Sequence, residues 1–304
     1  MRLGGGVARR SAKMRPDRAE MSKSRIDVIF HCPPKCYACR MNKLLILLVL
    51  LSGFAAPLRA ANTDYGTVQV LNGWQMPDGT HQAALVFDLN PGWKTYWRSP
   101  GPNGIPPQFN WLGSRNLAGV AISWPVPHMV GPAGAQALGY TDKVVIPIRF
   151  QPAAEGPISV ALYLEFGVCS DICIPASLSL LARLDPESSD GRELIEAALQ
   201  DVPHVGGSAD MAGYSCSILP SAQGYDVATQ LQLRQADQAA IVTIEYDNPE
   251  SWVEPSATVA NGPMLSSGGK IRFFAAGGMV ERDRLRVTVL TQGGAFELHG
   301  CPAG

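Results

Sequence analysis

The sequence has few charged residues and no long apolar run. Asp, Glu, Lys and Arg make up 17% of the 304 residues, and the longest apolar run, residues 44–56, contains Ser52 and Gly53. A membrane-spanning helix needs about 20 apolar residues, so we expect no stable membrane insertion. The five histidines lack the paired spacing of a metal site, and no nucleophile-elbow or zinc-hydrolase motif occurs. We therefore expect neither a bound metal nor a cofactor.

Acidic and basic residues are unevenly distributed along the chain, although the formal net charge is only -1. Residues 1–40 contain ten basic and three acidic residues, whereas the part after residue 60 contains 13 basic and 23 acidic residues. An acidic body repels phosphate backbones and anionic lipid surfaces. This charge argues against a nucleic-acid partner.

Residues 41–60 have the pattern of a secretory signal peptide. Lys43 provides the positive start, residues 44–56 the apolar stretch, and Ala60 the small residue at the cleavage site. We therefore expect the protein to be exported, with cleavage after Ala60.

Residues 1–40 precede that signal, and we interpret them as an upstream extension that arises from a misassigned start, with translation beginning at Met41. They include Cys32, Cys36 and Cys39. The alternative interpretation is a metal knuckle, but a fourth ligand at zinc-finger spacing is lacking. We exclude this extension from the prediction of the fold.

Four cysteines follow residue 60, namely Cys169, Cys173, Cys216 and Cys301. Disulfides persist in exported proteins, and four cysteines allow three pairings. The spacing favours Cys169 with Cys173 and Cys216 with Cys301. Closing the long loop would stabilise the fold by about 4–5 kcal/mol, against about 2 kcal/mol for the short loop. We predict that the long-loop bond is structural and that the short bond has another purpose.

The short pair requires a tight turn at residues 170–172. Residues four apart in a strand are about 13 Å apart, whereas disulfide-bonded Cα atoms lie within about 7 Å of each other. Small exposed disulfides are the ones that exchange with other thiols, which favours redox activity. Two buried, unpaired thiols and a purely structural clip are the alternatives.

Short strands separated by turn signals fill most of the chain after residue 60. Residues 158–166, for example, alternate between apolar and mixed positions. The pattern predicts an all-β protein with two antiparallel β-sandwiches, residues 62–184 and 208–304. The linker, residues 185–207, contains the one convincing helical stretch, residues 192–199.

Five segments of the first predicted sandwich point to a known family when taken together. In chain order they are GWKTYWRSPGPNGIPP (92–107), NWLGSRNL (110–117), WPVP (124–127), GYTDKVVIP (139–147) and VCSDICIP (168–175). Residues 65–184 resemble the N-terminal, immunoglobulin-like domain of the thiol:disulfide interchange protein DsbD family, in the variant found in ScsB-like copper-sensitivity suppressor proteins. The second sandwich resembles the additional sandwich of those longer relatives.

The resemblance implies a periplasmic electron carrier whose redox pair is Cys169 and Cys173. We place Tyr96, Asp171 and Tyr140 around that pair, and a cap loop within residues 128–140. The implied partners are thioredoxin-like periplasmic proteins or a DsbD/ScsB-type membrane electron conduit. We expect such a conduit to be another protein, because the chain after residue 60 has neither membrane helices nor a thioredoxin-like C-x-x-C motif.

The sequence neighbours of the pair are acidic, namely Glu165 and Asp171, with no adjacent Lys, Arg or His. Such neighbours raise the pKa of a thiol, so we predict that the pair is attacked by a partner's activated thiol. Two alternatives remain. One is a non-catalytic binding or scaffold module with structural disulfides, and the other is a copper-handling protein that uses both cysteines and Met129.

Overall fold

The computed structural model describes residues 61–207, 211–275 and 277–302. The upstream extension and signal peptide predicted for residues 1–60 lie outside these ranges. Within them, no helix has both the length and the apolar character needed to cross a membrane.

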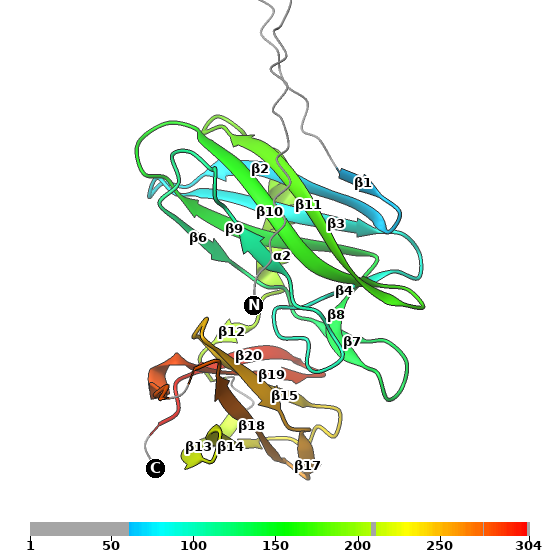
Figure 1. Cartoon of the computed structure of the whole chain (residues 1–304), viewed down its shortest axis with the longest axis vertical. Coiled ribbons are helices and arrows are strands. Elements are labelled where there is room, and N and C mark those ends of the chain that lie inside the picture. The colour runs from blue at the N-terminus through cyan, green and yellow to red at the C-terminus, as the bar shows by residue number, and fades with distance from the viewer. Residues whose placement is uncertain (1–60, 208–210, 276, 303–304) are drawn as a thin grey trace, which may run out of the picture. The chain divides into compact units, whose positions relative to one another are not determined.

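The first sandwich consists of two sheets that face each other across a shared core (Figure 1). One sheet contains, in spatial order, β1 (Ala61–Thr63), β2 (Gly66–Gln75), β3 (His81–Leu89), β9 (Lys143–Gln151) and β6 (Gly119–Ile122). The other contains β11 (Cys173–Leu184), β10 (Ile158–Cys169), β4 (Lys94–Tyr96), β8 (Ala137–Thr141) and β7 (His128–Val130), and β5 (Gln108–Asn110) also pairs with β10.

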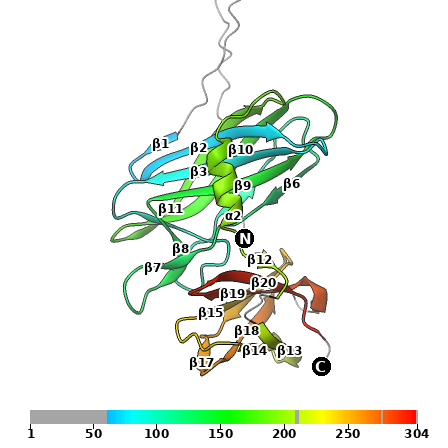
Figure 2. The same cartoon turned by 180° about the vertical axis from the view of Figure 1, so that it is seen from behind.

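Strand β3 is buried on both faces, although most strands of this fold alternate between buried and exposed positions. One face of β3 contributes Leu85 and Phe87 to the core between the sheets. The opposite face is covered by helix α2 (Arg192–Gln200), whose Ile195 packs with Ala84 in a small separate cluster. Figure 2 shows α2 lying against the sheet that contains β2, β3 and β9. The predicted linker therefore contributes a covering helix to this sandwich.

Strands β10 and β11 form a long antiparallel hairpin, whose register runs from Ile158↔Leu184 to Cys169↔Cys173. The even-numbered residues of β10 from 158 to 168 are all buried in the core. Because side chains alternate along a strand, Gly167 and Cys169 face outward. They are nevertheless buried, since β4 and the segments after it cover this end of the hairpin.

The second sandwich is also built from two sheets. One has the order β12 (His204–Val205), β20 (Gly294–His299), β19 (Leu285–Thr291) and β15 (Ile241–Tyr246), and β12 pairs with β20 in parallel. The other has the order β13 (Met211–Ser221), β14 (Gly224–Leu233), β18 (Met264–Phe273) and β16 (Ser251–Pro255), with β17 (Val259–Asn261) also on β18. The all-β, immunoglobulin-like sandwich fold predicted from the sequence is confirmed.

Candidate functional site: a disulfide at a hairpin tip

The tip of the β10–β11 hairpin holds a disulfide. Cys169 ends β10, Cys173 begins β11, and their sulfurs are bonded with the Cα atoms 4.1 Å apart. Only residues 170–172 connect the two strands, so the chain reverses within the tight turn that the four-residue spacing requires.

The two sulfurs differ in their surroundings. Cys169 is buried, with 4% of its surface exposed, because it lies on the covered outward face of β10. Cys173 is exposed, and so are its neighbours Ile172 and Ile174. An incoming thiolate therefore meets Cys173 first, at a tip whose surface is partly apolar.

A cavity of about 440 Å³ lies beside this disulfide. One wall comes from Lys94 and Tyr96 of β4, and a second comes from β7, β8 and the loop between them, which lies within the segment expected to hold a cap loop. The remaining lining residues are Asn103, Cys169, Ser170, Asp171 and Cys173. Both cysteines of the disulfide therefore line this cavity.

Tyr96 is buried and directs its phenol at the disulfide. Its Oη lies 3.1 Å from Sγ of Cys173, and burial raises the pKa of Tyr96 above its ordinary value. The phenol therefore keeps its proton at neutral pH and is available as a donor to sulfur. The ring fits between two glycines, since a Cβ on either Gly104 or Gly167 would lie 2.7–2.8 Å from ring carbons.

Lys94 brings a positive charge to the site that the cysteines' sequence neighbours do not provide. It lies directly opposite Cys169 in the β4–β10 pairing, and its Nζ donates a hydrogen bond of 2.9 Å to the carbonyl oxygen of Ser170. The sequence neighbours of the pair include no cation, and β-pairing supplies one from a residue that is far away in sequence. One signal could have revealed Lys94. It is two residues from Tyr96, which was predicted beside the pair, and residues two apart in a strand lie on the same face.

The other two residues predicted around the pair have different positions. Asp171 lies in the turn, exposed, and lines the cavity. Tyr140 does not line it. Tyr140 pairs with Thr95, which pairs in turn with Val168, so all three face the core and not the side of Cys169. The Tyr140 hydroxyl donates to the carbonyl oxygen of Pro125 at 2.7 Å, and burial raises the pKa of Tyr140 well above its ordinary value.

The second disulfide joins Cys216 on β13 to Cys301, which follows β20. Both residues are buried in the core of the second sandwich, with Cα atoms 5.3 Å apart. Arg282 holds this end of the chain by donating from Nε to the carbonyl oxygen of Cys301 at 2.7 Å.

Metal-ligating side chains do not gather in the part of the chain that the structure describes, since no three His, Cys, Asp or Glu residues come together there. Met129, which the copper-handling alternative uses, lies exposed on β7 and does not line the cavity beside the disulfide.

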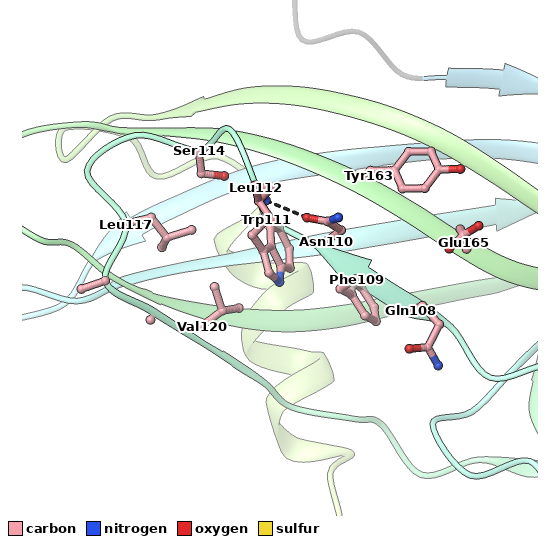
Figure 3. Close-up of a pocket in the computed structure, with 12 residues that line it drawn as sticks. Gln108, Phe109, Asn110, Trp111, Leu112, Ser114, Leu117, Val120, Tyr163 and Glu165 are labelled. Carbon is pink, nitrogen blue, oxygen red and sulfur yellow. Dashed lines mark hydrogen bonds between the residues drawn. The ribbon is translucent and has the colours of Figure 1, made fainter. Parts of the chain in front are cut away.

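A larger groove of about 810 Å³ lies elsewhere on the first sandwich and contains no cysteine. Figure 3 shows its aromatic lining, in which Phe109 and Trp111 stack with ring centroids 5.9 Å apart. Tyr163 and Glu165 of β10 line the same groove. The disulfide and this groove are thus separate features of the first sandwich.

These observations define an immunoglobulin-like domain that presents a small disulfide to solvent. Residues 67–183 match the family model for the N-terminal domain of the thiol:disulfide interchange protein DsbD. The chain is also similar to the crystal structure of the N-terminal periplasmic domain of ScsB from Proteus mirabilis, with a TM-score of 0.59 and 26% identity over 81% of this chain and 97% of that one. No curated protein sequence matches the chain. The chain therefore contains a DsbD/ScsB-like N-terminal domain, which confirms the resemblance drawn from its motifs.

Proposed function

We propose that this protein is a periplasmic thiol–disulfide exchange protein that relays reducing equivalents through Cys169 and Cys173. The observation that carries the proposal is the disulfide at the hairpin tip, between one exposed and one buried cysteine residue, in a domain of the DsbD type. The similarity to a periplasmic domain of ScsB supports the location. The donor would be a thioredoxin-like dithiol or a membrane electron conduit, and the acceptors would be periplasmic proteins with disulfides.

The exchange takes two steps. A partner thiolate attacks Sγ of Cys173, a bond forms between the two sulfurs, and the Cys169–Cys173 bond breaks with its electron pair leaving on Cys169. The partner's second thiolate then attacks its own sulfur in the mixed disulfide and releases Cys173 as a thiolate. Both cysteines take up protons from water, and the partner is left oxidised. The reduced pair passes two electrons onward by the reverse sequence with an oxidised acceptor.

Tyr96 has a positioning role in this chemistry. Its protonated hydroxyl, 3.1 Å from Sγ of Cys173 in the oxidised form, would donate a hydrogen bond to the Cys173 thiolate once the pair is reduced. Hydrogen bonds to charged groups contribute more than those to neutral ones, so this contact favours the reduced state.

Two single-cysteine variants test the proposal. Cys169→Ser leaves the exposed thiol of Cys173, and Cys173→Ser leaves the buried thiol of Cys169. Each variant is mixed with thioredoxin activated as its thionitrobenzoate mixed disulfide, and release of thionitrobenzoate is followed by absorbance. We expect the Cys169→Ser variant to form the protein–protein disulfide at least tenfold faster. Equal rates, or faster reaction of the Cys173→Ser variant, would contradict the assignment of Cys173 as the sulfur that meets the partner.

The scaffold alternative predicts a different result in the same assay. If the hairpin disulfide were a structural clip, neither single-cysteine variant would couple to the activated thioredoxin faster than the reduced, unfolded protein does.

A further inference from the structure

We infer that Lys94 is a positioning residue of the exchange reaction, which stabilises the thiolate that leaves on Cys169 when the disulfide opens. This inference rests on the proposed function and assigns the residue that makes Cys169 a good leaving group.

The geometry places the ammonium group near the buried sulfur. Nζ of Lys94 lies 2.9 Å from the carbonyl oxygen of Ser170, and Sγ of Cys169 lies 3.9 Å from the same oxygen. Nζ and Sγ are therefore within roughly 7 Å of each other. Directly opposed residues of an antiparallel pair share one face of the sheet, so both side chains point to the same side, and both line the cavity.

Burial makes this charge important for Cys169 in particular. When a partner attacks Cys173, the electron pair leaves on the sulfur of Cys169, a residue that is only 4% exposed and so has little hydration. An unpaired buried anion is unfavourable, and a nearby cation lowers the pKa of a thiol and so improves it as a leaving group. The Lys94 side chain is half-buried, which weakens the screening of its charge by solvent.

The other ionisable groups at the cavity do not replace Lys94. They are Asp171, whose negative charge acts against a thiolate, and Tyr96, whose hydroxyl contacts the sulfur of Cys173. Lys94 is the one cation among the described residues that line this cavity. At a partly buried site, a charge about 7 Å away changes an ionisation equilibrium by about tenfold.

The test measures the ionisation of Cys169 directly. In the Cys173→Ser background, the ultraviolet absorbance of the Cys169 thiolate is titrated against pH, with the Cys169→Ser/Cys173→Ser variant as the blank. Lys94→Met removes the charge and keeps an apolar stem, whereas Lys94→Arg keeps the charge. The matched control is Lys143→Met, because Lys143 pairs with Asp88 at 3.1 Å in the other sheet of the same sandwich.

We expect Lys94→Met to move the titration midpoint of Cys169 upward by about one pH unit. Lys94→Arg and Lys143→Met should leave it in place. With both cysteines present, Lys94→Met should slow the opening of the disulfide by dithiothreitol about threefold, and added salt should narrow that difference. If Lys94 only held the turn through its hydrogen bond to Ser170, Lys94→Met would produce neither the shift in the titration midpoint nor the salt dependence of the opening rate.

The outcomes separate this inference from the proposed function. The role of Lys94 is refuted, and the exchange function stands, if the wild-type disulfide opens readily but Lys94→Met leaves the titration midpoint of Cys169 unchanged. The same conclusion follows if Lys94→Arg moves that midpoint as far as Lys94→Met does. If the wild-type disulfide resists dithiothreitol until the protein unfolds, both are refuted.

Discussion

Replacement of Gly167 by alanine should disturb the layer of side chains that covers the disulfide. A Cβ at this position would lie 2.7 Å from Cβ of Ile105 and from Cδ2 of Tyr96, which is closer than side-chain carbons approach each other. The ring of Tyr96 has no room to retreat, because its other edge already packs closely against Gly104. Tyr96 must therefore shift, and its hydroxyl must leave the sulfur of Cys173.

Overpacking of this kind costs about 1–3 kcal/mol, which corresponds to a fall in Tm of about 4 °C per kcal/mol for a domain of this size. Five of the six tryptophans lie in the first sandwich, so intrinsic fluorescence reports mainly on its unfolding. We expect the Tm of Gly167→Ala to fall by about 4–12 °C.

The matched control is Gly119→Ala on β6, where an added Cβ would meet only Cβ of Gln151 at an ordinary 3.6 Å. Its Tm should remain within about 2 °C of the wild type, since surface substitutions without a clash change stability by less than about 0.5 kcal/mol. If Gly167→Ala were as stable as this control, the tight packing of Tyr96 between the two glycines would be refuted.

Three further changes have defined outcomes. Tyr96→Phe removes a hydrogen bond of about 1.5–3 kcal/mol to the charged Cys173 thiolate, so the midpoint potential of the pair should become about 30–65 mV more negative at unchanged Tm; an unchanged potential contradicts the contact. Cys216→Ser/Cys301→Ser should lower the stability of the second sandwich by about 4–5 kcal/mol without altering the rate at which the hairpin disulfide opens, measured by urea unfolding and dithiothreitol kinetics. Burial lowers the pKa of His81 below its ordinary value of 6.5, so below pH 6.5 the unfolded chain binds the extra proton and the protein becomes less stable as the pH falls. Between pH 7.5 and 5.5 the Tm should therefore fall less in His81→Gln than in the wild type, and equal slopes would refute this.

Local sequence patterns were sufficient to predict part of one long strand and the helix. The alternating residues 158–166 became part of β10, and the helix predicted at 192–199 is α2 (Arg192–Gln200). Short strands such as β4, β5 and β7 have only three residues each, which is too few for a periodic signal. Their positions depend on pairing with longer strands, which a local pattern does not encode.

Because only local patterns can be read from a sequence, only some parts of the site could be predicted. The spacing of Cys169 and Cys173 is local, so it foretold the tight turn between them. Lys94 is separated from this turn by more than 70 residues, and only the β4–β10 register places it opposite Cys169. Tyr140 was expected near the pair, but it lies opposite Thr95 in the β4–β8 pairing, and its side chain is buried in the core.

The central claim is that the hairpin disulfide exchanges whereas the disulfide of the second sandwich does not. The protein is equilibrated in glutathione and dithiothreitol buffers of graded potential, free thiols are alkylated, and mass spectrometry identifies the modified cysteines. We predict that Cys169 and Cys173 become alkylated together near the potential of the glutathione buffer, whereas Cys216 and Cys301 remain bonded to below about −300 mV. If both pairs resist until the protein unfolds, the hairpin disulfide is a structural clip and the account is wrong.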